Sequence, residues 1–159
     1  TNRAAATGRT SERGVQNLHG LPDAALWEMG DVAGGLLKYR RRHPVPGLTL
    51  AGGFAKISKL AAGHLDLHSG RSRVDLSRLS AHLRKMGADE EAIAALAGSP
   101  GGAFLDFARD HDLPLGDRIA EEARQVAIEV LDNGGGISDM LVEVAIFDRG
   151  GKLVGRAAG

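Results

Sequence analysis

The first 60 residues contain one short pattern three times: an apolar run, then glycine, then a segment with helical spacing. The runs are Ala4 to Thr7, Ala24 to Met29 and Leu48 to Ala51, and glycine follows each directly. Alternation of strand, glycine turn and helix is typical of a parallel sheet with right-handed crossovers. The pattern therefore predicts an α/β fold in which the three turns share one edge of the sheet.

Helices are expected after the three runs, at residues 10–18, 31–43 and 54–62. Thr10, Ser11 and Glu12 are start signals for the first helix. Asp31 can cap the second, and Gly63 can close the third. These assignments make each glycine turn a connection from a strand end to a helix start.

The second half of the chain predicts mainly helices. Leu76, Leu79 and Leu83 recur on one helical face, and shorter helices are expected at 91–96 and 103–108, separated by a glycine-rich break at 98–102. A longer helix is expected from a cap at Asp117 to about Leu131. The side chains expected to face the core from this helix are Ile119, Ala123, Val126 and Val130.

The C-terminal segment predicts a strand or hairpin at a sheet edge. The apolar run from Leu141 to Phe147 is followed by Asp148 to Gly151 as a turn into Lys152 to Val154. The predicted fold is therefore a three-layer α/β domain with a parallel sheet, βα units, a helical insertion and a C-terminal strand or hairpin, spanning residues 1–159 as one domain.

Composition excludes several classes of function. Twenty basic residues balance 20 acidic ones, so the global charge favours neither nucleic acid nor membrane as a partner. The chain has no cysteine, which excludes disulfides and thiolate chemistry. No apolar run approaches the roughly 20 residues that cross a bilayer, and the opening TNRAAATGRTSE lacks the apolar core of a signal peptide. A cytoplasmic location is expected.

The glycine turns lack the standard nucleotide fingerprints. GDVAGG contains no G-x-G-x-x-G, and GGFAKISK lacks the lysine directly after glycine that a P-loop requires. A nicotinamide-dependent dehydrogenase or an NTPase is therefore poorly supported. Any one such turn has its glycine more often for steric reasons than for a ligand, but three turns at one edge favour a binding site.

The most concentrated polar stretch runs from the third turn to Arg73. Lys56 and Lys59 are three residues apart and share a helical face, and His68 and Ser69 follow beyond the helix end. This set suits a ligand with several carboxylates or phosphates. The alternative is a solvated helix face followed by a polar loop. A second basic run, KYRRRH at 38–43, is interpreted as structural, because cations complement the end of a helix.

The sequence indicates a metal site or a catalytic nucleophile less strongly than it indicates a site for a polyanion. His64, Asp66 and His68 alternate, so an extended segment would place them on one face, but the expectation is that no metal binds. His19, His82 and His111 are interpreted as surface or helix residues. Spacing alone assigns no Ser/His/Asp set and no pair of catalytic carboxylates, and the catalytic residues stay unassigned.

The stretch from EMGD through LSRLS resembles the C-terminal half of the cobalt-precorrin-5B C1-methyltransferases, also called CbiD. The most specific part is GGFAKISKLAAGHLDLHS, which is similar to the family element G-x-x-G-K-x-x-K-L-A-x-G-x-x-x-x-H-S. The opening TGRTSE and the closing IFDRGGKLVGR also resemble family segments. The likeness covers nearly the whole chain and is least distinctive from about Asp89 to Leu115.

The resemblance implies methylation of cobalt-precorrin-5B at C1 in cobalamin biosynthesis, with S-adenosylmethionine as the methyl donor. The substrate would be a corrinoid polycarboxylate, and the partner would be the family's N-terminal domain, to which nothing in this sequence corresponds. Residues expected near the donor are Gly8, Thr10, Ser11, Gly30, Asp31 and Gly34. Residues expected near the corrinoid are Lys56, Lys59, His68 and Ser69.

Two alternatives stand beside this interpretation. A non-catalytic module that binds a tetrapyrrole or a nucleotide would explain the glycine turns without a second half of the enzyme. A metal-dependent hydrolase would use His64, Asp66 and His68.

Overall fold

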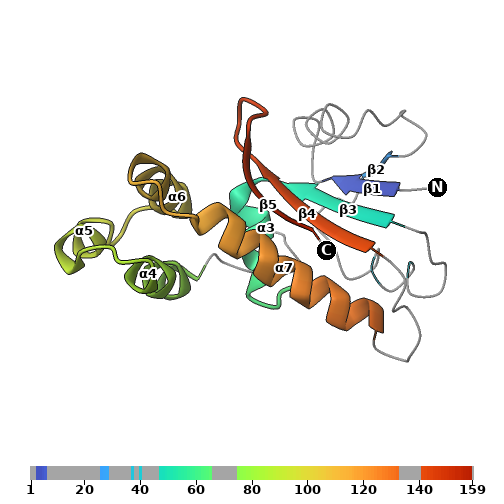
Figure 1. The fold of residues 1–159 in the computed structure, drawn as a ribbon, viewed down its shortest axis with the longest axis horizontal. Helices are drawn as coiled ribbons and strands as arrows, with labels where there is room; N and C mark the ends of the chain where they lie inside the picture. Colours follow the sequence, from blue (N-terminus) through green and yellow to red (C-terminus); the bar gives the residue numbers. More distant parts are fainter. Residues whose placement is uncertain are drawn as a thin grey trace.

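The computed structural model describes residues 3–6, 26–28, 37, 40, 47–65, 75–132 and 141–158. Its centre is a five-stranded sheet in the order β2-β1-β3-β4-β5 (Figure 1). The first four strands are parallel, and β5 is antiparallel to β4. The strands are β1 (Arg3–Ala6), β2 (Leu26–Glu28), β3 (Gly47–Gly52), β4 (Leu141–Phe147) and β5 (Leu153–Ala158). The predicted parallel α/β sheet with a C-terminal hairpin is confirmed.

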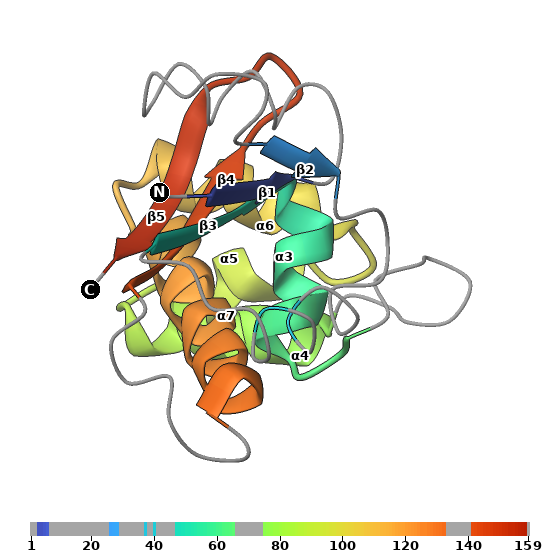
Figure 2. The ribbon, with the colours of Figure 1, turned by 90° about the vertical axis from the view of Figure 1, so that its right-hand side faces the viewer.

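Five helices are described in full, all of them in the connection from β3 to β4. They are α3 (Phe54–Ala61), α4 (Leu76–Lys85), α5 (Glu90–Ala95), α6 (Gly101–Asp110) and α7 (Leu115–Asp132). Helices α3 and α7 lie side by side against one face of the sheet (Figure 2). Helices α4, α5 and α6 form a separate lobe, on the side of the molecule toward which β1 points (Figure 1). This lobe is the predicted helical insertion. The helices expected at 10–18 and 31–43 lie outside the described residues, except for Leu37 and Arg40, which are helical and buried.

The core lies between the sheet and the α3–α7 layer. Alternate residues of β3 and β4, such as Leu50 and Val144, point to this layer and are fully buried. Ile57 and Leu60 of α3 and Ile119 of α7 meet them in one cluster. On the opposite face the buried side chains are Thr49, Ala51, Glu143 and Ala145, so that face is closed to solvent as well. Burial on both faces explains why β3 and β4 are nearly continuous apolar runs.

Helix α7 differs from its prediction at the start and along its inner face. It begins at Leu115, because the carbonyl of Pro114 already accepts from the Arg118 amide at 3.0 Å. Asp117 is therefore not the cap but a first-turn residue, and its carboxylate accepts from the Arg156 amide of β5 at 3.0 Å. Ile119 and Ala123 are buried as predicted. Val126 and Val130 are only half-buried, and the fully inward positions are Ala120, Ala127 and Leu131.

The lobe follows its prediction more closely. Leu79 and Leu83 are the buried face of α4, and Leu76 packs against the core from its edge. Helix α6 begins at Gly101, inside the stretch predicted as a break. None of the described helices combines the length and apolarity that a membrane span would need.

The start of α7 packs directly on the backbone of β5 through two glycines. A Cβ added to Gly116 would lie 2.1 Å from the Val154 carbonyl oxygen, and one added to Gly155 would lie 2.5 Å from the Gly116 carbonyl carbon. The neighbouring atoms are main-chain atoms, which cannot move aside as the end of a side chain could. The close contact between the backbones of α7 and β5 therefore requires glycine at both positions.

Replacing Gly116 by alanine is expected to lower the free energy of unfolding by about 1–3 kcal/mol, because the added methyl overpacks this contact. The matched control is Gly102→Ala, also in the first turn of a helix, where an added Cβ meets nothing within 4 Å. The control is expected to be neutral or slightly stabilising. Urea unfolding followed by circular dichroism measures both, and equal midpoints for the two variants would contradict the proposed contact.

Candidate functional site

The strand order creates a switch point between β1 and β3. The chain passes from β1 to β2 on one side and then to β3 on the other, and all three strands are parallel. In open parallel sheets, ligands bind beyond the carboxyl ends of the strands at such a point. The residues predicted at the first two turns lie outside the described residues, and their role stays a prediction. They are Gly8, Thr10, Ser11, Gly30, Asp31 and Gly34.

A hollow of about 650 Å³ lies at this edge, beyond the ends of β3 and β4. We call it the carboxyl-edge hollow. Its sides are the first turn of α3 from Gly53 to Ala55, the end of β4 and its turn from Phe147 to Gly150, and α6 residues from Gly102 to Arg109. The volume falls within the range of about 300–1,000 Å³ that is usual for small-molecule sites.

Gly53 leaves this hollow open. Its backbone has φ −74° and ψ 165°, which any residue can adopt, and an added Cβ would meet no atom within 4 Å. Neither backbone conformation nor packing among protein atoms therefore requires glycine here. Helix α3 starts without a side-chain cap and without an acidic residue in its first turn. The first amide groups of an α-helix have no intrahelical acceptor, and in α3 those of Phe54 and Ala55 lie at the hollow.

Two arginines and two carboxylates line the carboxyl-edge hollow. Arg109 comes from α6, and Arg149 comes from the β4–β5 turn. Asp148 accepts from the amides of Gly150 and Lys152, both at 2.9 Å, through one carboxylate oxygen. Its other oxygen lies 3.8 Å from the Arg109 guanidinium. The hollow thus combines a rigid turn with two cationic side chains.

Sequence reasoning missed Arg109 and Arg149. Arg109 lies on a helix predicted without any chemistry, and Arg149 lies in a turn interpreted only as a hairpin. One feature of the sequence could have indicated Arg149. The apolar run at 141–147 predicts a strand, and if that strand is parallel to β3, the turn after it lies at the carboxyl edge of the sheet, where ligands bind.

A second, more open hollow of about 820 Å³ adjoins the first and shares Asp106 and Arg109 with it. Its other wall is formed by β5 and the residues before it, from Lys152 to Arg156. Its remaining lining residues are Asp110, Asp112 and Asp117. None of its described lining residues is aromatic, whereas Phe54 and Phe147 line the carboxyl-edge hollow.

The two predicted lysines lie on α3 but line neither hollow. Lys56 is half-buried, whereas Lys59 is only 5% exposed, so the two do not form one solvated face. His68 and Ser69, predicted with them, lie outside the described residues. Contact of these four residues with a polyanion stays a prediction.

The weak metal motif is represented by one described residue. His64 is exposed just after α3, and Asp66 and His68 lie outside the described residues. Within the part of the chain that the structure describes, no three histidine or acidic side chains are grouped to hold a metal ion.

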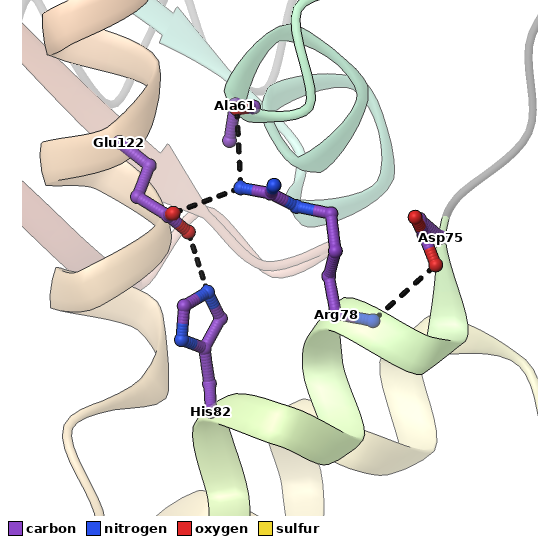
Figure 3. Close-up of polar contacts among 5 residues, drawn as sticks. All are labelled: Ala61, Asp75, Arg78, His82 and Glu122. Atoms are coloured by element: carbon purple, nitrogen blue, oxygen red, sulfur yellow. Dashed lines mark hydrogen bonds and ion pairs between the residues drawn. The ribbon is translucent and has the colours of Figure 1, made fainter. Parts of the chain in front are cut away.

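The most developed polar cluster joins three helices away from the hollows (Figure 3). Glu122 of α7 contacts Arg78 at 2.8 Å and His82 at 2.5 Å, both from α4. Arg78 also donates to the Ala61 carbonyl at the end of α3, at 3.4 Å. His82 is 8% exposed, so it is a buried helix residue and not a surface one. The cluster satisfies polar groups at a helix junction, which is a structural role.

Comparisons with known proteins bear on the whole chain. The family model described as CbiD, C-terminal domain, matches residues 66–158. A cobalt-precorrin-5B C(1)-methyltransferase of Halorhodospira halophila is 51% identical over 156 residues, which cover 97% of this chain and 40% of the relative. Enzymes of the same name from Paramagnetospirillum magneticum and a Bradyrhizobium species are each 48% identical, covering 97% and 98% of this chain and 42% and 41% of the relatives. The chain thus spans about two fifths of the length of these relatives. No solved structure matches the chain.

Replacing Glu122 by glutamine is expected to lower the free energy of unfolding by about 1–2 kcal/mol, because Arg78 and the buried His82 lose their charged partner. The control is Glu129→Gln on the same helix, where the side chain is exposed, and its effect should stay within about 0.5 kcal/mol. Thermal or urea unfolding of both variants measures the difference. An unfolding midpoint for Glu122→Gln equal to that of the control would refute the structural role.

Proposed function

The chain belongs to the CbiD family through its C-terminal domain, and from this membership we propose that it acts in cobalamin biosynthesis as part of a cobalt-precorrin-5B C(1)-methyltransferase. The observation that carries the proposal is the 51% identity, over 97% of this chain, to an enzyme of that name. Because the chain spans about two fifths of such relatives, the activity is proposed for the whole protein, to which this chain contributes one domain, residues 1–159. The cytoplasm is the proposed location.

The proposed reaction moves a methyl group from S-adenosylmethionine to C1 of the corrinoid. When bound, the donor supplies a sulfonium methyl, a good electrophile; the macrocycle carbon forms the new bond, and the electron pair of the broken C–S bond stays on sulfur. The protein then has to align two ligands and exclude water. This requires no covalent nucleophile, and among the residues that the structure describes neither a histidine nor a serine lines the carboxyl-edge hollow.

The carboxyl-edge hollow fits one end of such a ligand. Phe54, Leu105 and Phe147 offer an apolar wall, and Gly53 opens the backbone at the start of α3. Mixed apolar and polar lining of this kind is usual for small-molecule sites. The volume of about 650 Å³ suits a ligand of moderate size and leaves the rest of a macrocycle to be covered elsewhere.

Further contacts to the donor and to the corrinoid are proposed for ten residues. The residues proposed near the donor are Gly8, Thr10, Ser11, Gly30, Asp31 and Gly34, and those proposed near the corrinoid are Lys56, Lys59, His68 and Ser69. The region of the protein that corresponds to the other three fifths of the relatives is proposed to complete the site. A chain that binds the donor but supports no turnover in any longer form would instead fit the non-catalytic binding module.

The whole protein, supplied with S-adenosylmethionine and cobalt-precorrin-5B, is expected to yield a corrinoid with one added methyl group. Mass spectrometry of the product and of the S-adenosylhomocysteine released measures the reaction. Donor labelled in its methyl group provides the control for the origin of the new carbon. Absence of a methylated product with an intact, folded protein would refute the proposed activity.

Replacing Gly53 by valine is expected to weaken donor or corrinoid affinity by about tenfold or more, because the side chain occupies space in the hollow. The free energy of unfolding should fall by no more than about 1 kcal/mol, the cost of a poorer N-cap, since the backbone conformation is ordinary and an added Cβ meets no protein atom. Ala97→Val, at an exposed position outside both hollows, is the control. Calorimetry on the whole protein measures affinity, and unchanged affinity for both ligands would contradict this use of the hollow.

A further inference from the structure

We propose that Arg109 and Arg149 form a clamp for a carboxylate group of the ligand in the carboxyl-edge hollow. The inference rests on the proposed function and deepens it, because it names the two side chains that bind an anionic group of the donor or the substrate.

The two arginines reach the hollow from different parts of the fold. Arg109 lies in the last turn of α6, and Arg149 lies in the turn that follows β4. Their convergence depends on the packing of the lobe beside the strand ends and not on any spacing in the sequence. Two guanidinium groups on one small cavity can bind a planar carboxylate through paired N–H donors.

The donors of both arginines are open to a ligand. Arg109 lies 3.8 Å from Asp148, a distance for charge attraction without a hydrogen bond. Arg149 is exposed, and within the described part of the chain it forms no ion pair. Asp148 is meanwhile committed to the amides of Gly150 and Lys152, which fixes the turn that carries Arg149.

The surroundings favour an anion that is attached to an apolar body. Asp106 and Asp148 offset part of the positive charge, but the uncapped starts of α3 and α6 also border the hollow, and neither has an acidic residue in its first turn. Phe54, Leu105 and Phe147 line the hollow beside these charges. A free inorganic anion would leave these apolar side chains without a contact.

Two ligands of the proposed reaction carry carboxylates. One is the amino-acid end of S-adenosylmethionine, and the other is the set of acid side chains on the macrocycle. The chemistry that the arginines would recognise is the same in both, so the experiment has to distinguish the two sources.

The test uses calorimetry on the whole protein with two pairs of probes. The first pair is S-adenosylmethionine and its decarboxylated form; the second is cobyrinic acid and its heptamethyl ester. The wild type is expected to prefer the carboxylate form of at least one pair by about tenfold or more. Arg109→Ala and Arg149→Ala should each reduce that preference severalfold, and the pair affected identifies the source.

Arg118→Ala is the control, because this exposed arginine of α7 lines neither hollow. If Arg109→Ala and Arg149→Ala both bind as tightly as the wild type and keep its preference for the carboxylate form, the inference is overturned and the proposed function stands. A wild type that binds neither S-adenosylmethionine nor cobyrinic acid would instead count against the proposed function, and the inference would fall with it.

Discussion

The pairing of β3 with β4 is the interaction on which the rest of the structure depends. Thr49 of β3 donates to Glu143 of β4 at 2.9 Å across 94 residues of sequence, and Arg156 of β5 donates to the same carboxylate at 2.6 Å. A carboxylate that is only 8% exposed needs such partners, because burying an unpaired charge is costly. The pairing therefore joins the N-terminal parallel strands to the C-terminal hairpin, and it encloses all of α3 to α7 in one crossover connection.

The same register builds the candidate site. Gly52 is opposite Ile146, so the start of α3 and the turn after β4 emerge next to each other. Helix α6 then closes the third side. A slip of one residue would exchange the side chains that face the α3–α7 layer with those on the opposite face, since successive residues point to opposite faces. The shape of the hollow and the stability of the sheet thus depend on one set of backbone hydrogen bonds.

The polar side chains divide into two groups with different roles. Arg78, His82 and Glu122 contact one another at a helix junction (Figure 3), and none of the three lines either hollow. Arg109 and Arg149 are open to solvent and border a cavity. Methyl transfer from a sulfonium needs alignment more than proton transfer. A hollow lined by two arginines, Gly53 and two phenylalanines is consistent with the alignment that the proposed reaction needs.

The sequence by itself determined the strands, the helix after β3, the hairpin and the buried leucines of α4, because apolar periodicity and turn residues act locally. It also carried the family resemblance. Only the tertiary structure decided that Lys59 and His82 are buried and that Arg109 and Arg149 line the same hollow. Those outcomes depend on how α6 and α7 pack beside a sheet whose neighbouring strands, β3 and β4, are far apart in the sequence. The repeated apolar runs specify which segments become strands, but not which side chains long-range packing brings together at their ends.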